Sequence, residues 1–149
     1  MIISTKCQYA LRAVYEIVRS NHGQVLTIGT IARAQRIPQR YLEGILNQLR
    51  KGGLLEAQRG RSGGYKLARD AGGITVGEVV RLIDGPIRPM IPMEKAEAGN
   101  GPVREDFVFL PTWEKVQDAI DRALNSTTFS QLLEREREAQ VRSASSYVI

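Results

Sequence analysis

The clearest hydrophobic pattern in the chain lies between residues 38 and 51. Its apolar positions recur at helical spacing and fall on one face: Leu42, Ile45, Leu46 and Leu49. Pro38 suits the first turn of such a helix, because the N–H that proline lacks has no helical partner there. The pair Gly52-Gly53 then provides a stop. The pattern predicts a helix with one face in a core and a polar face outward.

A second, shorter helix is predicted immediately before this one. Thr27 is a suitable N-cap, and the helix would run through Gln35 with Ile28 and Ile31 facing inward. Residues 36–37 are then left to form a tight turn, because the residue before a proline is held in an extended conformation. Two short helices joined in this way predict a helix-turn-helix.

A glycine-rich hairpin follows the helix pair. Residues 54–58 have the pattern of a strand, and a return strand begins near Gly64. Between them the sequence is Arg-Gly-Arg-Ser-Gly, in which Arg59 and Arg61 could enter a narrow, electronegative minor groove. The alternative is a solvated hairpin tip. The helix pair just before it favours a DNA-binding wing.

The outward face of the predicted helix after Pro38 carries polar side chains that can hydrogen-bond base edges or phosphates. They are Gln39, Arg40, Glu43, Asn47 and Gln48. Gln39 and Arg40, in the first turn, are the candidates for base contacts. Glu43 has two open roles, since it could accept a hydrogen bond from a cytosine amino group or repel phosphates at wrong sites.

The N-terminal segment is predicted to form a helix from Ser4 or Thr5 to about residue 21. Lys6 lies at its start, and a lysine beside a helix N-terminus is a natural phosphate site. Tyr9 is a second candidate for DNA contact, although a tyrosine packed with its hydroxyl at the surface fits the sequence equally well. Cys7 is either a thiol with a lowered pKa or a quiet, partly buried one.

The second half of the chain contains further helical patterns. Spacing from Thr75 to Asp84 predicts a helix that closes a domain at residue 85. Residues 86–109 hold four prolines without a sustained period, so they are predicted to be a long loop that is functional or mobile.

A last long helix is predicted to open at Leu110-Pro111. Its apolar residues form a seam that could pair with a second copy of the chain: Trp113, Val116, Ile120 and Ala123. The alternative is a helix packed on its own domain. A capping box at Thr128 predicts a short terminal helix within residues 110–139, and residues 140–149 are expected to be a flexible tail.

Charge is divided unevenly along the 149 residues. The first 69 carry twelve Lys and Arg against three Glu, whereas the remainder carries nine against thirteen acidic residues. A basic half favours a polyanionic partner. No apolar run of about eighteen residues and no signal-peptide pattern occurs, so a cytoplasmic protein without a membrane partner is expected. One cysteine excludes an intramolecular disulfide.

An ordered set of short motifs resembles the Rrf2 family of bacterial transcription regulators. The motifs are Tyr9-Ala10-Leu11, Ile31-Ala32, Tyr41-Leu42-Glu43, the run from Leu49 to Leu54, and Arg59-Gly60 followed by Gly63-Gly64-Tyr65. The resemblance covers residues 1–85 closely and the rest in layout only. It implies a mostly α fold with a small β-hairpin wing, in which residues 1–85 form a winged helix-turn-helix and the helix from residue 110 mediates dimerisation. Tyr41 joins the DNA-binding candidates.

Sensing members of this family hold an iron–sulfur cluster on three cysteines in the region that corresponds to residues 86–109. This sequence has no cysteine there. Four carboxylates in the same region lack recognisable ligand spacing and are interpreted as solvated charge: Glu94, Glu97, Glu105 and Asp106. We therefore expect no cluster, no metal and no other cofactor, and the signal would come from a small-molecule effector or a partner protein.

Together these features predict a transcription regulator, expected to be a repressor, that binds a roughly palindromic operator in double-stranded DNA as a homodimer. The alternative is a winged-helix adaptor that binds proteins without sequence-specific DNA binding. An enzyme is not expected, because the sequence has no paired catalytic carboxylates, no phosphate-binding loop and no nucleophile beside a base.

Overall fold

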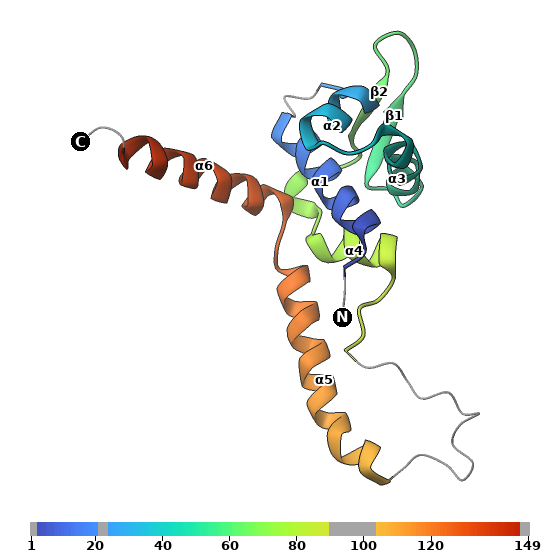
Figure 1. The fold of residues 1–149 in the computed structure, drawn as a ribbon, viewed down its shortest axis with the longest axis vertical. Coiled ribbons are helices and arrows are strands. Elements are labelled where there is room, and N and C mark those ends of the chain that lie inside the picture. Colours follow the sequence, from blue (N-terminus) through green and yellow to red (C-terminus); the bar gives the residue numbers. More distant parts are fainter. Residues whose placement is uncertain (1–2, 21–23, 90–103, 147–149) are drawn as a thin grey trace.

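The chain is mostly helical, with a two-stranded antiparallel sheet, in the computed structural model, which describes residues 3–20, 24–89 and 104–146. Three helices come first: α1 (Thr5–Ser20), α2 (Ile28–Gln35) and α3 (Gln39–Lys51). A hairpin follows, with strands β1 (Leu55–Gln58) and β2 (Gly64–Leu67). The remaining elements are the short 3-10 helix η1 (Ala71–Gly73), α4 (Val76–Asp84), α5 (Arg104–Asn125) and α6 (Phe129–Ser146). This order confirms the predicted fold class (Figure 1).

The turn between α2 and α3 has the predicted position. Thr27 caps α2 by accepting a hydrogen bond from the Thr30 amide at 3.1 Å. The helix ends at Arg36, which has a left-handed backbone with a φ of 52°, and the Ile37 amide donates to the Ala32 carbonyl at 2.9 Å. Pro38 then stands at the N-cap of α3. The connection between α2 and α3 is thus only three residues long and is tied to α2 by a backbone hydrogen bond.

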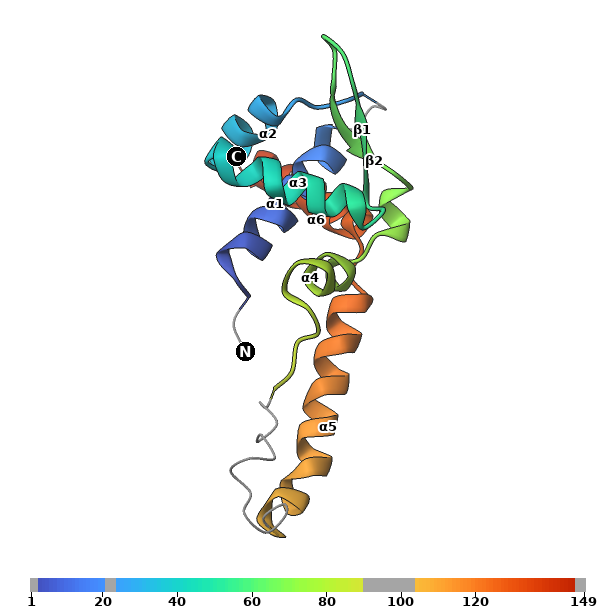
Figure 2. The same cartoon turned by 90° about the vertical axis from the view of Figure 1, so that its right-hand side faces the viewer.

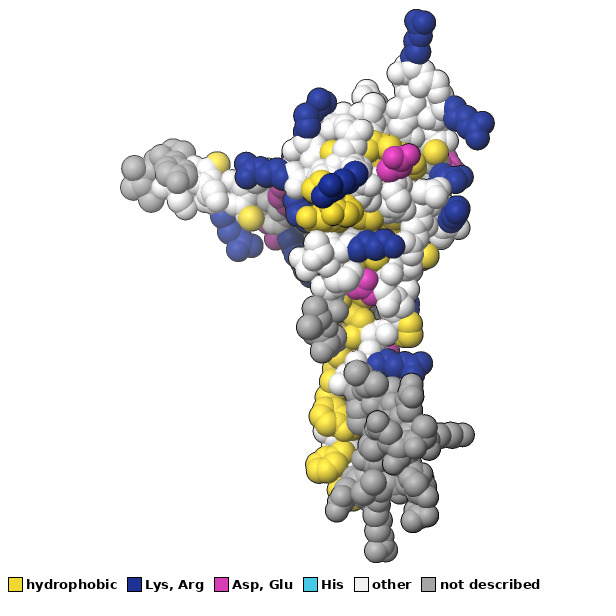
Figure 3. Space-filling view, turned by 45° about the vertical axis from the view of Figure 1, so that its right-hand side comes forward, with side chains coloured by type: hydrophobic (Ala, Val, Ile, Leu, Met, Phe, Trp, Pro, Cys, Tyr) yellow, Lys and Arg dark blue, Asp and Glu magenta, His cyan; other side chains and the backbone are white. Residues whose placement is uncertain are grey.

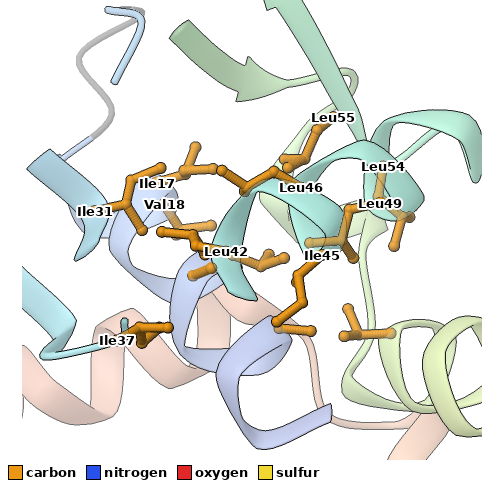
Figure 4. Packing of buried hydrophobic residues seen from close by; sticks show 14 of the residues in the cluster. Ile17, Val18, Ile31, Ile37, Leu42, Ile45, Leu46, Leu49, Leu54 and Leu55 are labelled. Carbon is orange, nitrogen blue, oxygen red and sulfur yellow. The ribbon is translucent and has the colours of Figure 1, made fainter. Parts of the chain in front are cut away.

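The inner face of α3 forms the centre of the hydrophobic core (Figure 4). Its four predicted core residues each expose 2 % or less of their surface: Leu42, Ile45, Leu46 and Leu49. They pack in one cluster with residues of α1 and α2, among them Ile17 and Ile31. Burying a side chain of this size contributes on the order of 1.5–3 kcal/mol, so this face cannot easily turn outward. The opposite face of α3 is thereby held toward solvent.

The hairpin is held against the helices by the segment that precedes α2. Leu26 forms a bridge with Tyr65 on β2, with backbone hydrogen bonds of 2.9 and 2.7 Å. Gly64 permits this approach, because a Cβ there would lie 2.2 Å from the Leu26 carbonyl oxygen. The strands pair from Leu55 opposite Leu67 to Gln58 opposite Gly64, and the tip projects from the helical domain (Figure 2).

The C-terminal helices are joined to the domain at their shared corner. Gly77 on α4 is buried, and a Cβ there would lie 2.4 Å from Asn125 Oδ1 at the end of α5. Phe129, at the start of α6, is 1 % exposed, and its amide donates to the Ile74 carbonyl at 3.1 Å. From this corner α5 extends away from the domain, whereas the first part of α6 packs against α1, with Leu132 and Leu133 against the core, before the helix continues outward (Figures 1 and 2). Within the described ranges, none of the helices combines the length and apolar character needed to span a bilayer.

Two predicted boundaries are wrong. Helix α5 begins at Arg104 rather than Leu110, with Pro111 inside it, so the predicted loop over residues 86–109 is too long; residues 90–103 lie outside the described ranges. Pro111 is the eighth residue of α5 and so lies past its first turn, where a proline removes one helical hydrogen bond and crowds the carbonyl four residues earlier. Helix α6 continues to Ser146 instead of ending near residue 139. Charge pairs one turn apart support this polar helix, including Arg142 with Glu138 at 3.6 Å.

A buried carboxylate links α1 to α2. Glu16 is 2 % exposed and accepts hydrogen bonds from Arg19 at 2.7 Å, Ser20 at 3.0 Å and the Gln35 side chain at 2.6 Å. Burial alone would raise the pKa of its carboxyl, but these three donors outweigh burial and hold the pKa below its usual value. Glu16 therefore stabilises the junction only while it is ionised.

Replacing Glu16 by glutamine is expected to lower the free energy of unfolding at pH 7 by about 1–3 kcal/mol, because the amide nitrogen would face other donors. A depressed folded-state pKa means that the carboxylate's contribution is present above the unfolded pKa and is lost as the pH falls through the folded value. The difference from wild type should therefore shrink below about pH 4.3. Urea titrations at several pH values measure it, with exposed Glu43→Gln as control. A difference independent of pH would contradict this role.

Candidate nucleic-acid interface

Three elements meet at the outer face of α3. One hollow of about 500 Å³ separates α3 from the start of α1 and is lined by Thr5, Lys6, Tyr9, Tyr41, Gly44 and Ile45. Another of about 630 Å³ separates α3 from the hairpin; its lining includes Glu43, Gly44, Asn47, Arg50, Glu56, Arg59 and Tyr65. Five of the predicted site residues thus line the two hollows beside α3, namely Lys6, Tyr9, Tyr41, Glu43 and Arg59, whereas Gln39, Arg40 and Arg61 line neither. Figure 3 shows Lys and Arg side chains at the hairpin tip and across the helical domain, with few Asp and Glu among them.

The first turn of α3 presents its polar side chains to solvent. Gln39, Arg40 and Tyr41 are all exposed, with 52 % of Tyr41 accessible. The Arg40 guanidinium carbon lies 4.7 Å from the centroid of the Tyr41 ring, and its Nη2 donates to the tyrosine hydroxyl at 3.1 Å. Stacking of this kind restricts the rotamers of a long side chain. Arg40 is therefore already oriented before any ligand arrives.

Farther along α3, the sequence-based expectation is only partly met. Glu43 is exposed, and Asn47 is half-buried and accepts a hydrogen bond from Arg50 Nη2 at 2.9 Å. Gln48, predicted to face outward, is also half-buried and donates to the Leu82 carbonyl on α4 at 2.9 Å. It lies at the edge of the outer face, where α4 packs beside α3. Gln48 is thus a link between helices rather than a free recognition side chain.

The start of α1 is tied to the same link. Lys6 is exposed, and its Nζ donates to Gln48 Oε1 at 2.7 Å, so the ammonium is positioned next to α3. Tyr9 is half-buried and packs against the core, and the guanidinium of Arg12 lies 5.7 Å from its ring centroid. Lys6 and Tyr9 both border the hollow toward Tyr41.

The wing carries two exposed arginines. Arg59 lies at the end of β1 and lines the hollow toward α3, while Arg61 stands at the turn itself. Arg50, which sequence reasoning did not assign to the site, is exposed in the last turn of α3 and lines the same hollow as Arg59. The sequence could have indicated this position, because Arg50 follows Glu43 by seven residues and therefore lies on the same side of the helix.

Cys7 is a buried thiol of low reactivity. Its side chain is fully buried in α1, and burial, reinforced by the nearby carboxylate of Asp84, raises its pKa to about 11. A thiol in this state is a poor nucleophile and a poor metal ligand near neutral pH. The described part of the chain contains no group of three His, Cys, Asp or Glu placed to hold a metal ion. Glu94 and Glu97 lie outside that part, as does the side chain of every residue from 104 to 107.

An apolar stripe runs along α5. Phe109 is 56 % exposed, and Trp113 and Val116 are each 36 % exposed. Ile120 is half-buried and Ala123 is exposed. Part of the stripe borders a hollow of about 410 Å³ against residues 86–89. Much of the predicted seam is therefore uncovered in a single copy of the chain.

Comparisons with known proteins agree with this geometry. The family model Rrf2, described as an iron-dependent transcriptional regulator, matches residues 3–135. The regulator CymR of Bacillus subtilis is 32 % identical over 132 residues, covering 89 % of each chain, and the regulator IscR of Citrobacter koseri is 28 % identical over 141 residues, covering 95 % of this chain and 85 % of its own.

Solved structures give the same assignment. The structure of CymR from B. subtilis superposes with a TM-score of 0.74 at 29 % identity and covers 91 % of this chain and 98 % of its own. That of T. potens IscR has a TM-score of 0.74 at 30 % identity and covers 94 % of this chain and 91 % of its own. With a family model matched from residue 3 to residue 135, the chain belongs to the Rrf2 family of transcriptional regulators.

Proposed function

We propose that this regulator binds a palindromic operator in double-stranded DNA as a homodimer and acts as a repressor, in the cytoplasm. The observation that carries the proposal is the convergence of the α1 start, the outer face of α3 and the arginine-bearing wing on one surface. Folding alone does not require exposed Arg40, Arg59 and Arg61 there. Family membership removes the ground for the adaptor hypothesis, because the matched family consists of transcriptional regulators.

The outer face of α3 enters the major groove in this proposal. A major groove about 12 Å wide admits a helix, and its base edges carry a distinct pattern of donors and acceptors. Gln39 and the pre-oriented Arg40 contact base edges, with Tyr41 holding Arg40 in place. Glu43 either accepts from a cytosine amino group or repels phosphates at wrong sites.

The flanking elements contact the backbone and the minor groove. Arg59 and Arg61 on the wing reach the adjacent minor groove, where a narrow A/T-rich segment concentrates negative potential. Lys6, held beside α3 by Gln48, contacts a phosphate, and Tyr9 adds a second contact from the same helix. Backbone contacts of this kind fix the register of α3, whereas the contacts of α3 read the sequence.

Dimerisation occurs through the stripe on α5. A row that contains the exposed Trp113 and Val116 and the half-buried Ile120 has the spacing of a helix seam, and a second copy related by a two-fold axis would cover it. Two copies then present two α3 helices to half-sites separated by whole turns of DNA. The two-fold axis of the protein explains why the operator should be palindromic.

The signal to which the regulator responds is not an iron–sulfur cluster. The family model is described as iron-dependent, but such clusters are held by several thiolates, and this chain has one cysteine, buried in α1. The single buried cysteine of this chain therefore does not fit an iron–sulfur cluster. An effector, either a small molecule or a partner protein, would instead act near the hollow between residues 86–89 and α5, which is bordered by Arg88 and Trp113.

Truncating an arginine on α3 and truncating one on the wing should change DNA binding in different ways. Arg40→Ala is expected to flatten sequence preference at one base pair per half-site, at a cost of about 1–3 kcal/mol if the contact is bidentate. Arg59→Ala should cost most on operators with A/T-rich flanks. Affinities for selected operators and flank variants measure both effects, with Arg135→Ala on α6 as a matched loss of one positive charge. Operator binding that survives both Arg40→Ala and Arg59→Ala would exclude the docking proposed here.

Ile120→Glu tests the dimer. It would place like charges near the two-fold axis in an apolar seam and should shift the protein toward monomer. Sedimentation at micromolar concentration measures the shift, and Lys115→Gln, which also lowers the charge by one at an exposed position on the same helix, controls for the change in charge. A dimer that is unchanged by Ile120→Glu would move the interface elsewhere, and a monomeric wild type would remove it.

A further inference from the structure

Gly44 lies at a position where glycine is energetically unfavourable. It lies in the middle of α3, and glycine is among the least favourable residues in a helix interior because it loses the most backbone freedom on folding. Its surface is exposed, and it is not among the glycines with positive φ. No backbone conformation therefore requires glycine at this point.

Packing within the protein does not require it either. A Cβ added at Gly44 would meet no atom within 4 Å beyond its chain neighbours and the helix's own backbone. The contrast with other glycines is clear, since a Cβ at Gly52 would lie 2.4 Å from the Leu82 side chain, and one at Gly64 would lie 2.2 Å from a carbonyl oxygen. The fold explains those two glycines and leaves Gly44 without a structural reason.

The place of Gly44 on α3 indicates where the reason lies. Arg40, Gly44, Asn47 and Lys51 follow one another at spacings of four, three and four, opposite the buried face. Gly44 is the middle of this outermost row, and it borders both the hollow toward α1 and the hollow toward the wing. Gly44 is thus an exposed stretch of α3 backbone between the two hollows.

We propose that Gly44 is the site of closest approach between α3 and DNA, where its backbone packs against the C5-methyl group of a thymine. The inference rests on the proposed docking of α3 in the major groove. A mid-helix glycine offers only its Cα hydrogens, because its backbone N–H and C=O are used within the helix. Such a surface can make only an apolar contact, and the thymine methyl is the apolar group on the major-groove edges. Gly44 is therefore a specificity-determining residue.

Gly44→Ala should change stability and binding in opposite directions. The substitution is expected to raise the thermal midpoint by about 2–4 °C. It should weaken binding to an operator selected from random DNA by about tenfold or more, because a methyl group is forced into a filled contact. Affinity for unrelated DNA, which depends on phosphate contacts, should be unchanged. Wild-type affinity for the operator, or a lowered midpoint, would overturn the proposal.

A methyl exchange tests the thymine contact directly. Deoxyuridine in place of each operator thymine in turn removes only the C5-methyl group. At one position per half-site, this change should weaken binding of wild type and strengthen binding of Gly44→Ala, whose new methyl fills the space. Failure to find such a position would overturn the contact. If wild type selects no operator, or if Arg40→Ala binds the operator as well as wild type does, the proposed docking of α3 itself is wrong. If only Gly44→Ala behaves as wild type, the assignment of Gly44 fails alone.

Discussion

Burial of one face of α3 against α1 and α2 is the interaction on which the rest of the structure depends. Leu42, Ile45, Leu46 and Leu49 cannot leave the core without exposing most of its centre, so the opposite face of α3 has only one orientation. The tight turn at Arg36 then sets the direction in which that face begins, because no residue between the two helices is free to absorb a different angle. A recognition surface is obtained here as a consequence of packing.

Polar contacts at the edges of α3 refine this orientation. Gln48 joins α3 to both α4 and α1, through the Leu82 carbonyl and the Lys6 ammonium, and Ser4 at the start of α1 donates to Asp84 at the end of α4. These contacts join the end of α4, from which the chain leaves for the proposed effector region, directly to the helices proposed to meet DNA. A displacement of that end would therefore reach α1 and α3 through hydrogen bonds that the structure already contains.

Sequence patterns predicted the parts of the molecule that follow from local rules. The period of α3, the Thr27 cap and the glycines at the hairpin each follow from geometry within a few residues, and the structure contains all of them. The inward role of Gln48 could not be predicted, because it depends on α4, which lies more than thirty residues away. The start of α5 was misplaced because Pro111 is a strong local stop signal that a long helix can nevertheless contain. The roles assigned to single residues at the interface stay predictions.

Hydroxyl-radical footprinting of a selected operator tests most directly the central proposal, that two copies of α3 and two wings bind one palindrome. Two symmetric protected regions are expected, with centres separated by whole helical turns, about 34 Å or a multiple of it. Minor-groove protection is also expected beside each region and should disappear with Arg59→Ala. A single protected region, or protection without sequence preference, would contradict the proposal.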